Sequence, residues 1–171
     1  CDSFLNVCPT LAFVWDVEAV HLDYVKGLAD IQKSFHKFAS RATFGVVANG
    51  DDPHTVQAME GIDYVSFGLG EGNRIHAATM HPDWRHFDVI CAGKYYCHLD
   101  MGVLGRHNAM IALAASAAAW MRGIPGETVS KGIQSFHGAG RRMEFKGKFN
   151  GADVYDDYAH HPDELKATLE A

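Results

Sequence analysis

The part of the sequence richest in reactive side chains is the run Asp156-Asp157-Tyr158-Ala159-His160-His161-Pro162. Aspartate and histidine both bind divalent ions, so the run taken alone is compatible with a metal site. It is also compatible with a polar loop that caps the following helix. However, the run lies between a predicted strand and a predicted helix, where ligands bind in open α/β sheets. Two carboxylates, a phenol and two imidazoles at that place favour a ligand site.

Three further groups have side chains suited to binding. Arg141-Arg142 could bind phosphate through paired guanidinium groups, although a solvated basic pair is the alternative. His107-Asn108 stands at the start of a predicted helix, where these side chains could cap the helix or hydrogen-bond a purine edge. His21 follows the end of a predicted strand, where it could bind a metal ion or serve as a structural histidine.

Composition excludes several classes of protein. The chain has 171 residues and a formal net charge of −6 without a block of like charges, which argues against nucleic-acid binding. No apolar run is long enough to span a bilayer, and no signal peptide is visible. The four cysteines match no zinc-binding spacing and are interpreted as free thiols in a reducing compartment. We therefore expect a cytoplasmic protein without membrane insertion.

The first part of the chain alternates between strand and helix patterns. Apolar runs predict strands, and a helical spacing of apolar residues predicts the helix between the first two of them. Such alternation is typical of a mostly parallel sheet covered by helices. The expected strands are Leu11–Asp16, Thr43–Ala48 and Asp63–Phe67, and the expected helices are Leu28–Ala39 and Pro53–Glu60.

The pattern changes after Gly68, where strand-like runs follow one another with short turns and no helix. This arrangement predicts a small antiparallel meander attached to the parallel sheet. An Ala-rich helix and a shorter helix come next, and the small side chains of the first allow close packing on a sheet. The runs are Arg74–Met80, Phe87–Cys91 and Tyr95–Leu99, and the helices are Gly105–Arg122 and Glu127–Phe136.

A domain boundary is predicted at the glycine-rich linker near Gly138–Arg141. The first domain would cover residues 1–138 and the second residues 139–171. Met143–Phe149 and Ala152–Asp156 form a predicted hairpin around an Asn-Gly turn. Pro162 then begins a predicted helix.

Five motifs occur in the order found in one known family. Together they cover nearly the whole chain, which therefore resembles the Mur ligases. The resemblance implies an α/β fold, with part of the family's central ATP-binding domain before the start of its Rossmann-like C-terminal amino-acid-binding domain. The motifs are Ser3–Asp23 (family NIEADHLD at its end), Asn49–Pro53 (NGDDP), Gly105–Ala115 (GRHNVLNALAA), Arg141–Glu144 (RRFE) and Asp156–Pro162 (DDYAHHP).

The resemblance also implies an activity. The doubled Asp and doubled His of the last motif point to ATP-dependent ligation of L-alanine to UDP-N-acetylmuramate, through an acyl phosphate, in peptidoglycan precursor synthesis. A murein-peptide recycling ligase of the same fold is an alternative. From the residues alone, a metal-dependent hydrolase is a further alternative, and it would use Asp156, Asp157, His160 and His161.

Roles for individual residues follow from the same resemblance. ATP and Mg²⁺ would be the cofactors, and UDP-N-acetylmuramate and L-alanine the substrates. His21 would bind magnesium, His107 and Asn108 the adenine, Arg141 and Arg142 the ATP phosphates, Asp157 the ribose, and Tyr158 and His160 the alanine, with Arg142 and His160 as catalytic residues.

The sequence departs from the family's motifs at several places. Val20 replaces an Asp that could partner His21, Asp16 replaces an Asn, Ile111 replaces the second Asn of the adenine motif, and Met143 replaces a Phe.

The family's phosphate-binding loop and its magnesium-binding Glu have no counterpart here. We therefore expect the chain alone not to turn over. We also expect the strand at Leu11–Asp16 to lack a neighbour, and either to self-associate through that edge or to be covered by the N-terminal residues.

Overall fold

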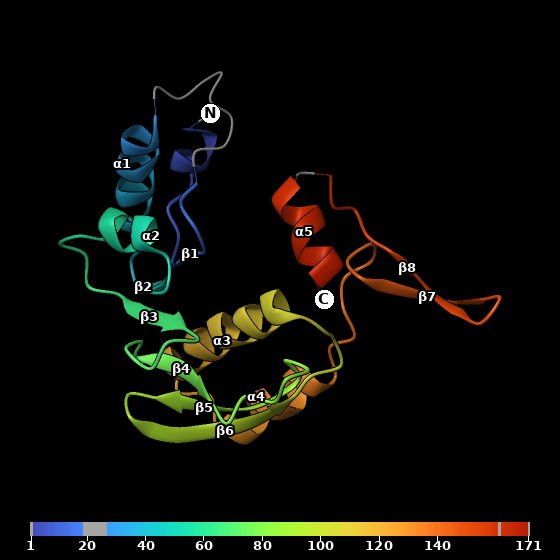
Figure 1. Ribbon diagram of the computed structural model, residues 1–171. Coiled ribbons are helices and arrows are strands. Elements are labelled where there is room, and N and C mark those ends of the chain that lie inside the picture. The colour runs from blue at the N-terminus through green and yellow to red at the C-terminus, as the bar shows by residue number, and fades with distance from the viewer. Residues whose placement is uncertain (1, 19–26, 161, 171) are drawn as a thin grey trace.

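The computed structural model describes residues 2–18, 27–160 and 162–170 (Figure 1). These residues form a six-stranded sheet with the order β1-β2-β3-β4-β5-β6 and a separate two-stranded sheet, β7-β8. The mixed α/β architecture confirms the fold class expected from the sequence.

The first half of the large sheet is parallel. β1 (Leu11–Val14) pairs with β2 (Gly45–Asn49), and β2 pairs with β3 (Val65–Gly68). The connecting helices are α1 (Leu28–Ala39) and α2 (Pro53–Ala58). Asp52 caps α2 by accepting hydrogen bonds from the backbone N–H groups of its first turn, and a proline stands at the helix start. These elements confirm the predicted alternation of strands and helices.

The second half of the large sheet is the predicted meander. β4 (Ile75–Ala78) pairs parallel with β3 and antiparallel with β5 (His86–Cys91), which pairs antiparallel with β6 (Lys94–Asp100). β4 is shorter than the predicted strand. Thr79 has a positive φ of 49°, a conformation outside the β region, so the strand ends before it.

Two helices follow the meander. α3 (Arg106–Met121) packs on β2, β3, β4 and β5, and α4 (Gly126–Gln134) packs on β6. Much of α3 is alanine, and its small buried side chains allow the helix axis to approach the sheet closely. The main core therefore lies between α3 and the sheet, with Phe67, Phe87 and Leu113 fully buried within it.

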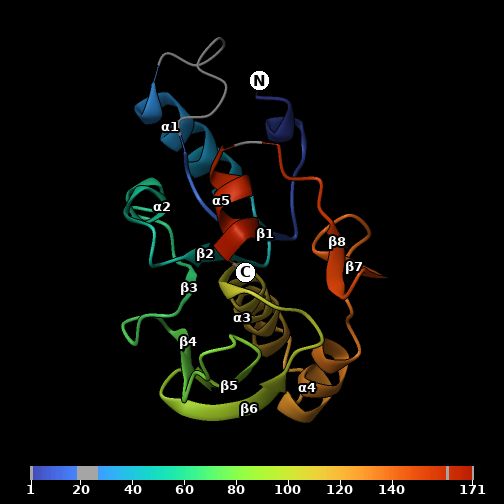
Figure 2. The same cartoon turned by 45° about the vertical axis from the view of Figure 1, so that its right-hand side comes forward.

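The last part of the chain forms the hairpin of β7 (Glu144–Phe149) and β8 (Ala152–Asp156), and then α5 (Pro162–Glu170). Asn150 and Gly151 both have positive φ, as a two-residue hairpin turn of this kind requires. Figures 1 and 2 show the hairpin lying apart from the large sheet, while the last turn of α5 lies beside the first turn of α3. The proposed domain boundary at residues 138–139 falls between α4 and this hairpin.

β1 has β2 as its single partner among the described residues, and the Phe13 side chain is 45% exposed. The short helix η1 (Asp2–Asn6) contacts α1, where Phe4 stacks on Phe35 and meets Phe38 edge-on. Self-association through the β1 edge remains a prediction.

Among the described residues, none of the helices combines the length and the apolar character that a bilayer crossing requires.

Candidate functional site

The start of α3 carries two of the predicted site residues. The N-cap position is Gly105, and no side chain accepts a hydrogen bond from the first turn. The Asn108 side chain instead donates from Nδ2 to the carbonyl oxygen of Leu104, at 2.6 Å. The capping interpretation of His107 and Asn108 is therefore wrong. Both side chains are half-buried, and neither caps the helix.

Asp157 holds together the base of the β7–β8 hairpin and the loop before α5. Its carboxylate accepts hydrogen bonds from the backbone N–H groups of Met143 and Ala159, both at 2.7 Å. Desolvation acts to raise the pKa of this carboxyl. These two bonds, a hydrogen bond from Thr168 and the charge of Arg142 outweigh that effect, so the pKa lies below its ordinary value. Asp157 is thus a carboxylate at neutral pH, with a fixed orientation.

Arg141, Tyr158 and His160 pack against one another on the exposed side of the same loop. The Arg141 guanidinium lies 4.7 Å from the centre of the Tyr158 ring, and its Nε is 3.6 Å from a carboxylate oxygen of Asp156. The rings of Tyr158 and His160 meet edge-on with centroids 5.2 Å apart. His160 also contacts Glu164, whose carboxylate accepts from the His160 backbone N–H. The structure therefore brings three predicted site residues together as one polar and aromatic surface.

His107, at the start of α3, interacts with charged groups of the segments that surround Asp157. Desolvation lowers the pKa of its imidazole, the Asp157 carboxylate raises it, and the Arg142 guanidinium lowers it, with a net decrease. A lowered pKa keeps this imidazole neutral near pH 7, with one ring nitrogen as donor and the other as acceptor. The start of α3, the residue after the glycine linker and the loop after β8 are therefore close enough to interact electrostatically.

A second polar group lies beyond the ends of β1 and β2. The Asp52 carboxylate accepts hydrogen bonds from the backbone N–H of Val17 and from the backbone and hydroxyl of Thr55. Desolvation, followed by the charges of Glu18 and Asp52, raises the pKa of Asp16. The NGDDP motif did not by itself predict this role of Asp52. An Asp directly before a helix-starting proline was the available signal.

The predicted metal ligand cannot be compared with the structure, because His21 lies outside the described residues. Within the described ranges, no group of three or more His, Cys, Asp or Glu side chains could hold a metal ion. The hydrolase alternative needs a metal held by Asp156, Asp157, His160 and His161. The Asp157 carboxylate instead accepts hydrogen bonds from two backbone N–H groups. His161, like His21, lies outside the described residues.

The arrangement has the chemistry that a nucleotide requires. A neutral, half-buried imidazole can hydrogen-bond a base, an oriented carboxylate can accept from sugar hydroxyls, and an exposed guanidinium can bind phosphate. His107, Asp157 and Arg142 supply these three groups from different segments. Asn108 is one residue along α3 from His107. The resemblance assigns all four residues to the nucleotide, and this assignment stays a prediction.

Comparisons with known proteins show to which family the chain belongs. The model of the Mur ligase middle domain matches residues 3–119, and that of the Mur ligase glutamate ligase domain matches residues 141–171. The UDP-N-acetylmuramate–L-alanine ligase of Caldanaerobacter subterraneus subsp. tengcongensis is 38% identical over 99% of this chain and 38% of its own length. The enzyme of the same name from Bdellovibrio bacteriovorus is 37% identical over 99% of this chain and 39% of its own length.

A solved structure shows the same fold. The crystal structure of a UDP-N-acetylmuramate–alanine ligase from Thermotoga maritima matches with a TM-score of 0.84 and 25% identity, over 99% of this chain and 39% of that one. The chain thus spans about two-fifths of the length of the relatives it matches. On the match of the middle-domain model to most of its residues, the chain belongs to the Mur ligase family.

Proposed function

We propose that the protein uses ATP to join L-alanine to UDP-N-acetylmuramate in the cytoplasm, as a step in making peptidoglycan precursor. The observation that carries the proposal is that the start of α3, with His107, lies beside the last turn of α5, while Asp157 is hydrogen-bonded to the backbone next to Arg142. His107, Arg142 and Asp157 are three groups suited to a base, a phosphate and a sugar. Family membership and the names of the relatives support the choice of substrates.

The proposed reaction has two steps. The γ-phosphoryl group passes from ATP to a carboxylate oxygen of UDP-N-acetylmuramate, which forms an acyl phosphate and releases ADP. The amine of alanine then attacks the acyl carbon, phosphate leaves with the electrons of the C–O bond, and the nitrogen loses a proton to give the amide. Catalysis of phosphoryl transfer rests mainly on positioning and on stabilising charge.

The described residues provide much of what the nucleotide needs. His107 and Asn108 would contact the adenine, Asp157 the ribose, and Arg142 the phosphates, with Arg141 beside it. The lowered pKa values of His107 and Asp157 support these roles, because they keep the imidazole neutral and the carboxylate charged near pH 7. When bound, Mg²⁺ would supply further neutralisation of phosphate charge, and His21 is the residue proposed to hold it.

The surface formed by Arg141, Tyr158 and His160 would border the incoming alanine. In this proposal His160 is a catalytic residue that lies against the reacting amine. Its imidazole Nδ1 is 3.0 Å from the Tyr158 carbonyl oxygen and 3.6 Å from a Glu164 carboxylate oxygen, contacts that orient the ring. An oriented ring at this place can hold the amine of alanine near the acyl carbon.

We also propose that the 171-residue chain alone has no turnover. Its sequence contains no glycine-rich loop with the Lys and Thr that the family uses for the phosphates.

The test uses the complete gene product and follows phosphate release. We expect release to require ATP, UDP-N-acetylmuramate and L-alanine together. Arg142→Ala should reduce kcat by about 100-fold or more, as removal of a group that stabilises transition-state charge does. Arg122→Ala, at the far end of α3 with its guanidinium over the Phe44 ring, is the matched control and should keep full activity.

Two results would redirect the proposal. Release that depends on a preassembled peptide in place of alanine would indicate the recycling ligase. Phosphate release that ignores both acceptor and amine, or equal activity of the Arg142 and Arg122 variants, would contradict the proposal.

A further inference from the structure

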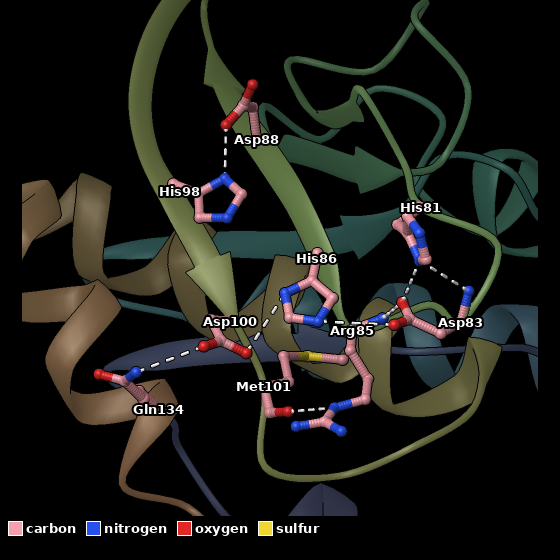
Figure 3. A network of polar contacts seen from close by, with 9 residues as sticks. All are labelled: His81, Asp83, Arg85, His86, Asp88, His98, Asp100, Met101 and Gln134. Carbon is pink, nitrogen blue, oxygen red and sulfur yellow. Dashed lines mark hydrogen bonds and ion pairs between the residues drawn. The ribbon is translucent and has the colours of Figure 1, made fainter.

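The segment Met101–Gly105 joins β6 to α3, and its first residue is held firmly. Met101 is buried, and its backbone is bound twice by Arg85. The Met101 N–H donates to the Arg85 carbonyl oxygen at 3.0 Å, and the Arg85 Nε donates to the Met101 carbonyl oxygen at 2.7 Å. Figure 3 shows the side-chain bond. These two hydrogen bonds fix the N–H and the carbonyl oxygen of Met101, at the start of the segment.

The other end of the segment determines how Asn108 is oriented. The Leu104 carbonyl oxygen can only accept a hydrogen bond, so the Asn108 side chain must present Nδ2 to it, at 2.6 Å. The amide oxygen Oδ1 then points the other way. A ligand that meets this oxygen must offer a donor, such as the 6-amino group of adenine. A purine with a carbonyl at position 6 would place two acceptors against each other.

Arg85 belongs to a wider polar network that spans several elements (Figure 3). Its backbone N–H donates to Asp83 at 2.9 Å, and this bond is the main reason that the pKa of Asp83 lies below its ordinary value. Asp83 also contacts His86, whose ring reaches Asp100 at the end of β6. The network therefore ties the turn before β5 to the end of β6, next to Met101.

We propose that Arg85 is a positioning residue for base recognition. By holding Met101 it fixes the segment that carries the Leu104 carbonyl, and this carbonyl in turn fixes the Asn108 amide. The site consequently prefers a 6-aminopurine to a 6-oxopurine. This inference rests on the proposed function for its ligand class, and it assigns a role to a residue outside the motifs discussed above.

The first test compares ATP with ITP in the complete gene product. Loss of a hydrogen bond that holds the segment should raise the KM for ATP by about fivefold in Arg85→Ala, with little change for ITP, so that the preference for ATP shrinks. Arg85→Lys keeps a donor for the Met101 carbonyl and should recover most of the preference. Arg74→Ala, which removes a guanidinium from the Trp120 ring, is the matched control and should leave the ratio unchanged.

A purely structural role for Arg85 predicts a different result. In that case Arg85→Ala would lower the melting temperature or kcat while the ratio of the two KM values stayed at the wild-type level, and this outcome overturns the proposal.

A second measurement does not depend on catalysis. Hydrogen exchange in Arg85→Ala should become faster across residues 101–109 and stay unchanged in β1 and β2, because the substitution releases one segment and not the sheet. Unchanged exchange at residues 101–109 would refute the positioning role even in an active enzyme. Faster exchange in a protein that does not use ATP would contradict the proposed function and leave the link from Arg85 to the segment intact.

Discussion

The large sheet and the C-terminal hairpin with α5 are stabilised in different ways. In the large sheet, Phe67 and Phe87 are fully buried beneath α3. In the hairpin, Phe145 and Phe149 are 53% and 70% exposed, although both stand on β7, which is as long as the β5 strand that carries Phe87. Strand pairing and an aromatic sequence therefore do not by themselves make a core. The first region is held by burial of apolar side chains, and the second by polar contacts around Asp157.

This difference explains where the candidate site lies. α3 is fixed on the sheet by close packing, so the positions of His107 and Asn108 are set by the core. Arg141, Arg142 and Tyr158 depend instead on the hydrogen bonds that hold the loop and the hairpin base together. A ligand between the two regions would contact one face that is fixed by core packing. The other face would be one whose position depends on the polar contacts of Asp157.

The sharpest test of the comparison is the same substitution in both regions. Phe87→Ala should lower the free energy of unfolding by about 3–5 kcal/mol, because it opens a cavity in a packed core. Phe149→Ala should change it by less than about 0.5 kcal/mol, since that side chain is 70% exposed. Urea denaturation followed by circular dichroism measures both. Similar losses in the two variants would remove the distinction.

The next test concerns the polar contacts of the second region. Asp157→Ala leaves the Met143 and Ala159 N–H groups without their acceptor, and should destabilise the hairpin and α5 by about 1–2 kcal/mol. Hydrogen exchange should accelerate at residues 141–170 and not in β1–β6. Asp153→Ala, which removes an exposed carboxylate paired with Lys148, is the control.

Acid should act on the same carboxyl in the wild-type protein. Because the folded pKa of Asp157 lies below its ordinary value of 3.8, its stabilising effect is complete above that value. The effect is lost as the pH falls through the lower, folded value. The protection of hairpin amides, relative to the intrinsic exchange rate at each pH, should therefore fall on acidification in this range more in wild type than in Asp157→Ala.

The smallest expected effect compares two cation–π contacts, one in each region. Arg141→Ala removes the contact with Tyr158, and Arg122→Ala removes the contact with Phe44. Both arginines lie near the surface, so each loss should cost less than about 1 kcal/mol. Arg141→Ala should in addition alter the fluorescence of Tyr158, which no longer has a cation over its ring. A loss of several kcal/mol in the free energy of unfolding of either variant would contradict this expectation, because it would mean that the cation–π contact contributes substantially to stability.

Most elements could be predicted from the sequence because their periodicity reflects burial. The helix at Leu28–Ala39 and the strand at Ala152–Asp156 match the predicted bounds. Ends were less accurate where backbone conformation decides them, as at Thr79 after β4. The exposure of the hairpin aromatics was not predictable, because a strand pattern does not say whether another layer covers it.

The sequence motifs single out candidate residues for the site, but they do not predict the contacts among them. Motifs identified His107, Asn108, Arg142 and Asp157, since each carries a functional group at a fixed place in the family pattern. The orientation of Asn108 depends on the Leu104 carbonyl, a backbone group that no sequence pattern marks. Contacts of this kind arise only when distant segments are packed together.

The central claim is that His107, Arg142 and Asp157 share one site, and an NMR titration of the His107 imidazole tests it most directly. In the wild-type chain the pKa of His107 should lie below its ordinary value of 6.5. It should fall further in Asp157→Asn, which removes a neighbouring negative charge, and rise in Arg142→Ala, which removes a positive one. A His107 pKa that is the same in all three proteins would contradict the account.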